Sequence, residues 1–142
     1  PDPDAEGHTV VIGANLFSSD PGAIEAGCGP VNGTTQTGAV PMCNGACIKV
    51  NQLGTVTEVL SSAALLTDAA GVSCVVGHRS EGETSDTVIC DLAVGIGAQF
   101  LTIGGLCRSE HTMKFNRLIE IENQLRKEGR LDAHFIEGDE QH

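Results

Sequence analysis

Four short apolar runs, each followed by a longer amphipathic run, most constrain what this chain can fold into. The apolar runs cover residues 9–16, 46–51, 73–77 and 100–104. Each is near-continuous in apolar residues, as expected for a strand that is buried on both faces of a parallel sheet. Alternation of short and long runs is typical of strand-helix repeats, and it disfavours a helical bundle or an all-β sandwich. We therefore predict an α/β fold built on four parallel strands.

The run after each strand carries helix signals. The first helix is predicted over residues 20–27, because Asp20 is a good N-cap and a proline costs nothing at the first helical position. The second is predicted over residues 55–70 and opens with a capping box formed by Thr55 and Glu58. The third helix follows a turn at Gly82, and the fourth spans residues 109–129. Both carry apolar residues at helical spacing that are expected to be buried. In the third helix these are Val88, Ile89, Leu92, Ala93 and Ile96, and in the fourth they are Met113, Leu118, Ile121 and Leu125.

Four strand-helix units do not close a sheet. A closed (β/α) barrel takes about eight units, so four leave two strand edges and an apolar face without partners. We expect the remainder of the barrel, on the same polypeptide or on another protein chain, to complete the sheet. The chain opens Pro-Asp-Pro-Asp, with no basic and apolar leader, and is interpreted as the inside of a longer gene product.

The chain divides into a folded unit with polar ends. We predict an N-terminal stub at residues 1–8, a half-barrel over residues 9–129 and an acidic tail over residues 130–142. The half-barrel contains an inserted loop at residues 28–45, which is rich in Gly, Thr, Asn and Pro and longer than the roughly 2–6 residues usual for such a connection.

Charge and hydropathy restrict the partners. The chain has 8 Lys and Arg against 19 Asp and Glu, a formal net charge of -11. Nucleic acids and anionic membrane surfaces are bound by clustered Lys and Arg, so we expect neither as a partner. No apolar run approaches the ~20 residues needed to span a bilayer. We expect a soluble, cytoplasmic protein.

The six cysteines are interpreted as free thiols of a reducing compartment. Four of them lie in apolar, strand-like or helix-like runs and are expected to be buried: Cys47, Cys74, Cys90 and Cys107. Metal-ligand spacing is approached only by Cys43 and Cys47, with no second pair to complete a zinc site. A cysteine-based metal or redox protein would require Cys28, Cys43 and Cys47 to converge.

The candidate site residues follow the strands, because functional loops of parallel strand-helix folds lie at the carboxyl ends of the strands. Lys49 stands inside an apolar strand, where burial would lower the pKa of its ammonium and make it a base. Alternatively, Lys49 points into solvent or pairs with a carboxylate. The run of His78, Arg79 and Ser80 suits a phosphate or carboxylate ligand.

Several motifs together resemble one family. They are ACIKVNQLGTVTE at residues 46–58, GHRS at 77–80, GETSDT at 82–87, DLAVG at 91–95 and CRSE at 107–110. They resemble the C-terminal part of an enolase (phosphopyruvate hydratase), from about residue 10 to about residue 125 apart from the inserted loop. The resemblance implies the C-terminal four strand-helix units of an enolase-type TIM (β/α) barrel, incomplete on its own.

The resemblance also implies roles for individual residues. Lys49 matches the lysine that removes the C2 proton of 2-phosphoglycerate in glycolysis, while Mg²⁺ stabilises the ene-diolate. His78 matches a residue of the loop that contacts the substrate, and Arg79 and Ser80 match the residues that hold its phosphate.

Three departures from the family pattern predict weak catalysis. Ala14 stands where enolases have an aspartate that ligates magnesium, and alanine offers no oxygen to a hard cation. Thr102 stands where they have a second active-site lysine, and Glu81 is an extra residue beside the expected phosphate site. Loss of one such ligand or charge commonly costs ~10²–10³ in rate. Magnesium binding by this chain is therefore doubtful.

The leading hypothesis is thus a divergent enolase-family protein, impaired as a lyase and kept as a structural component of a larger assembly. The divergent pattern resembles enolase-like proteins of sperm and cilia, which suggests a ciliary axoneme, and the family implies a dimer. One alternative is an active Mg²⁺-dependent enolase in which Asp20 replaces the lost ligand. Another is a module that binds a phosphorylated metabolite through Arg79 and Ser80 without turnover.

Overall fold

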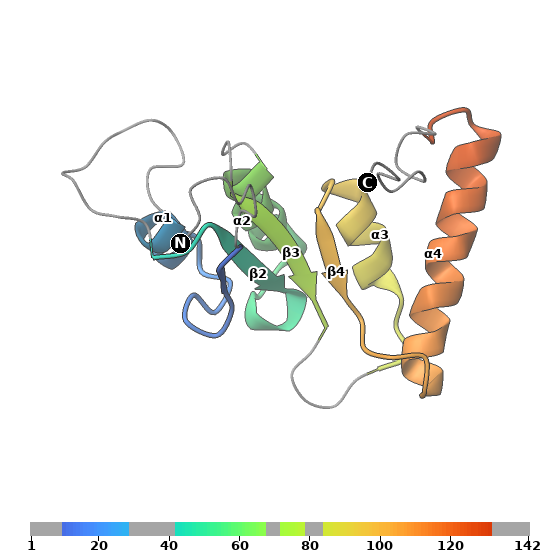
Figure 1. Cartoon of the computed structure of the whole chain (residues 1–142), viewed down its shortest axis with the longest axis horizontal. Helices are drawn as coiled ribbons and strands as arrows, with labels where there is room; N and C mark the ends of the chain where they lie inside the picture. The colour runs from blue at the N-terminus through green and yellow to red at the C-terminus, as the bar shows by residue number, and fades with distance from the viewer. Residues whose placement is uncertain (1–9, 29–41, 68–71, 79–83, 132–142) are drawn as a thin grey trace, which may run out of the picture.

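A computed structural model describes residues 10–28, 42–67, 72–78 and 84–131 of the chain (Figure 1). Several predicted features lie outside these residues. They are the N-terminal stub, most of the inserted loop, the end of the second helix, nearly all of the acidic tail, and Arg79, Ser80 and Glu81.

The sheet has the predicted parallel order. Its strands are β1 (Ile12–Gly13), β2 (Gly45–Lys49), β3 (Ser73–Gly77) and β4 (Phe100–Thr102), arranged β1-β2-β3-β4. All three neighbouring pairs are parallel, and the described strands form an open sheet, not a closed barrel. The α/β half-barrel predicted from the sequence is confirmed.

Three strands are shorter than predicted, since β4 also ends early, at Thr102 instead of Gly104. β1 is two residues long because Ala14 begins a tight turn, in which its carbonyl accepts hydrogen bonds from the amides of Phe17 and Ser18. β2 ends at Lys49 because the next residues form a 3₁₀ helix, η1 (Val50–Gln52). β3 has the predicted bounds.

Four helices follow the strands: α1 (Pro21–Cys28), α2 (Val56–Thr67), α3 (Val88–Gly95) and α4 (Ser109–Lys127). Asp20 caps α1, since its Oδ2 accepts a hydrogen bond of 2.8 Å from the amide of Ala23. The predicted capping box of α2 is confirmed: the Glu58 amide donates to Thr55 Oγ1 at 3.2 Å, and the Thr55 amide donates to Glu58 Oε2 at 2.9 Å. Among these helices none is long and apolar enough to cross a membrane.

The core lies between one face of the sheet and the helices. Alternate residues of the two central strands, such as Ile48 and Cys74, are fully buried against α1 and α2. Val76 of β3 belongs to a second cluster, which α3 and α4 cover. The edge strands carry exposed apolar side chains: Ile12 is 40% exposed and Phe100 is 51% exposed.

The prediction for α4 was largely wrong in its buried residues. Met113 is exposed, and Leu118, Ile121 and Leu125 are only half-buried. The buried residue of α4 is instead Lys114. The reason is visible in Figure 1, where α4 lies at the outside of the molecule with α3 as its neighbour.

The third helix and the cysteines fit the predictions more closely. Ile89 and Ala93 are buried as predicted, whereas Val88 is exposed at the start of α3 and Leu92 and Ile96 are half-buried. Five cysteines are buried, but the prediction was wrong for Cys107, which is exposed because it lies in the turn between β4 and α4.

Candidate functional site

Lys49, Gly77 and Thr102 lie side by side across three strands. The register pairs Lys49 of β2 with Gly77 of β3, and Gly77 with Thr102 of β4. A methyl group added at Gly77 would lie 3.4 Å from Lys49 Cγ and 3.4 Å from Thr102 Oγ1. Both side chains therefore lean over the glycine on the same face of the sheet, opposite the helix-packed core. The structure brings together the predicted base and Thr102, the position where the family resemblance implies a second lysine.

Lys49 is half-buried, not fully buried as the apolar strand suggested. It is the last residue of β2, and its backbone amide donates a hydrogen bond of 2.8 Å to Ser19 Oγ. On the same face of β2, burial raises the pKa of the Cys47 thiol, while the charge of Lys49 lowers it. The strand end thus fixes the backbone of Lys49 and leaves its side chain at the border between protein and solvent.

His78 directly follows β3 and is tied to β4. Its backbone amide and its Nδ1 both bond the carbonyl oxygen of Thr102, at 3.0 and 2.9 Å. A carbonyl only accepts, so Nδ1 carries the proton and Nε2 of the neutral ring is the acceptor. This tautomer leaves Nε2 as the ring nitrogen that can accept a proton or a hydrogen bond at the strand end.

A second histidine, which the sequence reasoning missed, lies near His78. The ring of His111 is centred 6.2 Å from that of His78, and its Nδ1 bonds the carbonyl oxygen of Gly105 at 2.9 Å. The ring packs against Gly104, whose φ of +79° is left-handed and where an added methyl group would lie 2.5 Å from the ring. The Gly-Gly pair at residues 104–105 was the available signal, because it allows a ring to approach the backbone closely.

The strand end that precedes α1 offers no carboxylate in the expected place. Ala14 follows β1 directly, its side chain is a methyl group, and its carbonyl is used within the turn. Asp20, the suggested replacement ligand, uses Oδ2 to cap α1.

The described residues show no carboxylate at the position where the family resemblance implies a magnesium ligand. Mg²⁺ in enzymes is bound through one or two carboxylates, and Ala14 supplies none. Within residues 10–28, 42–67, 72–78 and 84–131, no three side chains of His, Cys, Asp or Glu are grouped so that they can hold a metal ion.

A cavity of about 170 Å³ opens beside His78. It lies between the ends of β2 and β3, the start of α3, and α4; its polar lining residues are Asn51, His78, Thr84, Asp86 and Lys114. The lining also includes Val50, Val88 and Ile89, so a ligand would meet apolar and polar groups together.

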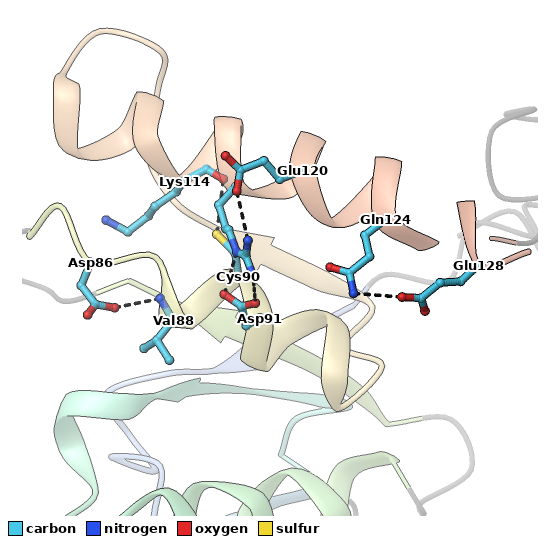
Figure 2. A network of polar contacts seen from close by, with 9 residues as sticks. Asp86, Val88, Cys90, Asp91, Lys114, Glu120, Gln124 and Glu128 are labelled. Atoms are coloured by element: carbon cyan, nitrogen blue, oxygen red, sulfur yellow. Dashed lines mark hydrogen bonds and ion pairs between the residues drawn. The ribbon is translucent and has the colours of Figure 1, made fainter. Parts of the chain in front are cut away.

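Lys114 is the charged residue of this cavity that the sequence reasoning missed. It is 1% exposed, and its Nζ donates to the carbonyl oxygens of Thr84 at 2.7 Å and Glu110 at 3.2 Å. In Figure 2 its side chain extends from α4 toward the segment that carries Asp86. Lys114 thus fixes the end of the connection between β3 and α3. Its spacing of four residues from Leu118 was the available signal, because the two share a helix face.

Four parallel strand-helix units with a lysine at one strand end and a histidine at the next define a (β/α)-barrel type of site. The family model described as "Enolase, C-terminal TIM barrel domain" matches residues 30–137. The chain belongs to the enolase family.

Two curated relatives are similar to much of the chain. The "Enolase" of Malacoplasma penetrans (strain HF-2) is 42% identical over 115 residues, which are 81% of this chain and 23% of that protein. The "Enolase 1" of Methylococcus capsulatus (strain ATCC 33009 / NCIMB 11132 / Bath) is 49% identical over 89 residues, 63% of this chain and 21% of that protein. The chain therefore spans less than a quarter of the length of these relatives.

Proposed function

We propose that this chain forms the base-bearing half of an enolase-type site for 2-phosphoglycerate, and that this site turns its substrate over poorly. In this proposal Lys49 is the base for the C2 proton and His78 contacts the substrate. Arg79 and Ser80, which follow His78 in the chain, hold the phosphate. The observation that carries the proposal is the row of Lys49, Gly77 and Thr102 across the strand ends.

Thr102 supports the impairment. Its hydroxyl stands at the level of Lys49, where the family resemblance implies a second ammonium. Removing the proton from 2-phosphoglycerate adds negative charge to an already anionic substrate, and a neutral hydroxyl stabilises that charge less than an ammonium does. Loss of one such electrostatic donor commonly lowers the rate by ~10²–10³.

Ala14 supports the proposed impairment of catalysis independently of Thr102. The position lacks a side-chain oxygen for magnesium, and Asp20 is engaged at the start of α1. Loss of a metal ligand and loss of a cation act on the same transition state, so we expect little residual turnover.

The proposed principal role is structural, within a larger assembly. The exposed apolar residues of the edge strands, Ile12 and Phe100, support completion of the sheet by another part of the polypeptide or by a partner chain. A cytoplasmic site, an enolase-type dimer and a place in a ciliary axoneme stay predictions.

The test is the magnesium-dependent conversion of 2-phosphoglycerate to phosphoenolpyruvate by the full-length protein. We expect the rate to be within about tenfold of that of a Lys49→Ala variant, and we expect an Ala14→Asp/Thr102→Lys double variant to be at least ~10²-fold faster. Lys49→Ala, prepared identically, controls for contaminating enolase.

Each other result selects a different function. Turnover at ordinary enolase rates that disappears in Lys49→Ala would overturn the impairment and indicate an active glycolytic enolase. A double variant no faster than the natural protein would show that Ala14 and Thr102 do not limit the rate. Stabilisation by 2-phosphoglycerate without magnesium and without turnover would favour the phosphometabolite-binding module.

A further inference from the structure

Ser19, in the turn between β1 and α1, is a fully buried polar residue that contacts the end of β2. It is 0% exposed. Its Oγ accepts a hydrogen bond of 2.8 Å from the backbone amide of Lys49 and donates one of 2.6 Å to Oε1 of Gln52. Its carbonyl oxygen accepts a hydrogen bond of 3.1 Å from Ser62 Oγ of α2. One residue therefore links the first turn of the half-barrel to β2, η1 and α2.

The backbone adopts an uncommon conformation to place this hydroxyl. Ser18 has a φ of 46° and Ser19 a φ of 60°, both in the left-handed region that non-glycine residues rarely adopt. No other non-glycine residue in the described part of the chain has a positive φ. Such strain persists only where the surrounding structure holds it, and it is concentrated at functional sites.

The surroundings do hold this turn. The ring of Phe17 is buried against Gly13 and Gly27, where any side chain would overlap it. Asp20 closes the turn from the other side, since its amide donates to the carbonyl oxygen of Phe17 at 2.8 Å and its carboxylate caps α1. Ser19 is thus presented to β2 from a fixed loop.

Ser19 binds β2 beyond the point where the pairing of β1 with β2 ends. β1 pairs with β2 only as far as Gly13 and Ala46, three residues before Lys49. On its other side Lys49 is still paired with Gly77 of β3. On the side that faces away from β3, β1 does not extend as far as Lys49. There the hydroxyl of Ser19 accepts the hydrogen bond of the Lys49 amide in place of a strand.

We propose that Ser19 is a positioning residue for Lys49, the proposed base. Ser19 sets the orientation of Lys49 because its hydroxyl binds both the backbone amide of Lys49 and the side chain of Gln52 in the following turn. The inference rests on the proposed function in naming Lys49 as the base. The geometry requires the hydroxyl of residue 19 and its left-handed backbone together.

Matched glycine variants separate the hydroxyl from the backbone. Ser19→Gly keeps the left-handed conformation and removes the hydroxyl, because glycine adopts positive φ readily. Ser18→Gly is the control: it makes the same change next door, at an exposed residue whose hydroxyl bonds only the nearby carbonyl of Asn15 among the contacts seen for it.

The first readout is the amine-labelling rate of Lys49 relative to Lys127 in the full-length protein, measured by mass spectrometry. We expect this ratio to rise about threefold or more in Ser19→Gly and to be unchanged in Ser18→Gly. A natural ratio in Ser19→Gly would overturn the proposal. If Ser19→Gly fails to fold, Gln52→Ala removes the partner of the same hydroxyl; a rise in its ratio supports the proposal and a natural ratio overturns it.

The second readout is catalytic, in the Ala14→Asp/Thr102→Lys background. We expect Ser19→Gly to lower kcat about tenfold with KM changed less than about twofold, because a displaced base slows the proton transfer more than it weakens binding. An inactive double variant would count against the proposed function alone, since the labelling ratio decides the role of Ser19 without turnover. A loss of kcat equal in Ser19→Gly and Ser18→Gly would overturn the proposal.

Discussion

Asp91 of α3 and Arg117 of α4 form a two-pronged ion pair, with Nη2 2.6 Å from Oδ1 and Nε 3.1 Å from Oδ2. Arg117 also bonds Glu120 one helical turn further on, at 3.0 Å. The pair fixes the outermost helix of the half-barrel to its neighbour, at a place where few apolar side chains are buried.

Asp91→Asn is expected to lower the stability slightly and to change its dependence on pH. The hydrogen bonds from Arg117 hold the pKa of Asp91 below its ordinary value of 3.8. At a pH above 3.8, the ordinary pKa, the ionised carboxylate therefore stabilises the folded state. This stabilisation is lost as the pH falls through the lowered pKa of Asp91 in the folded protein. Because both side chains are substantially exposed, the effect is small and weakened by about 1 M salt.

Thermal unfolding of the full-length protein measures this effect. At neutral pH the natural protein should have a higher melting temperature than Asp91→Asn, and this difference should disappear under strongly acidic conditions. Glu122→Gln, at an exposed pair within α4, is the matched control and should have less effect. A difference that persists undiminished in acid would contradict the assignment.

Gly27→Ala is expected to destabilise the protein by about 1–3 kcal/mol, because the added methyl group would overlap the buried ring of Phe17. Gly95→Ala at the end of α3 is the control, since nothing lies within 4 Å of the position where its methyl group would be. It should be neutral or stabilising by up to about 1 kcal/mol. Urea unfolding followed by circular dichroism compares the two, and equal losses would argue against the packing of Phe17.

The sheet order and β3 were predictable from the sequence, whereas the length of β1 was not. The apolar run of β3 coincides with its bounds, and each of its residues is paired with β2. β1 was predicted too long because Val10 and Val11 are apolar, yet they are 41% and 50% exposed. Apolar character marks where a strand can form, but pairing with β2 decides where it ends.

The site was predictable where it depends on parallel order. Lys49 and Thr102 meet across Gly77 because the carboxyl ends of parallel strands share an edge. Ser19 was not predictable, because a left-handed serine has no local sequence signal and its partners lie 30 or more residues away. Buried polar contacts of this kind depend on tertiary structure, which periodicity does not encode.

Lys114→Met is expected to destabilise the protein by about 1–3 kcal/mol. Methionine fills the space of the lysine stem, but the carbonyl oxygens of Thr84 and Glu110 lose a donor. Lys127→Met, at the exposed end of the same helix, should change the stability little. Urea unfolding measures the loss, and hydrogen exchange should accelerate near residue 84 in Lys114→Met alone. Equal stability of the two variants would mean that the buried ammonium contributes nothing.

The thiols of Cys74 and Cys107 are expected to react very differently with iodoacetamide. Burial raises the pKa of Cys74 to about 11, helped by the neighbouring Cys47, and its side chain is 0% exposed. Near pH 8 only about one Cys74 thiol in 10³ is a thiolate, whereas Cys107 is exposed. Mass spectrometry of the labelled native protein should find Cys107 modified first and Cys74 protected until unfolding.

The same raised pKa predicts a loss of stability at alkaline pH. A thiol with an ordinary pKa of 9.0 in the unfolded chain ionises there before it ionises in the folded protein. The stability that this difference provides is complete below pH 9.0 and is lost as the pH rises toward about 11. Cys74→Ala should therefore lose less stability than the natural protein between these values, while Cys107→Ala should follow the natural protein. Rapid labelling of Cys74 in the folded state, or parallel alkaline curves for all three proteins, would contradict its burial against the helices.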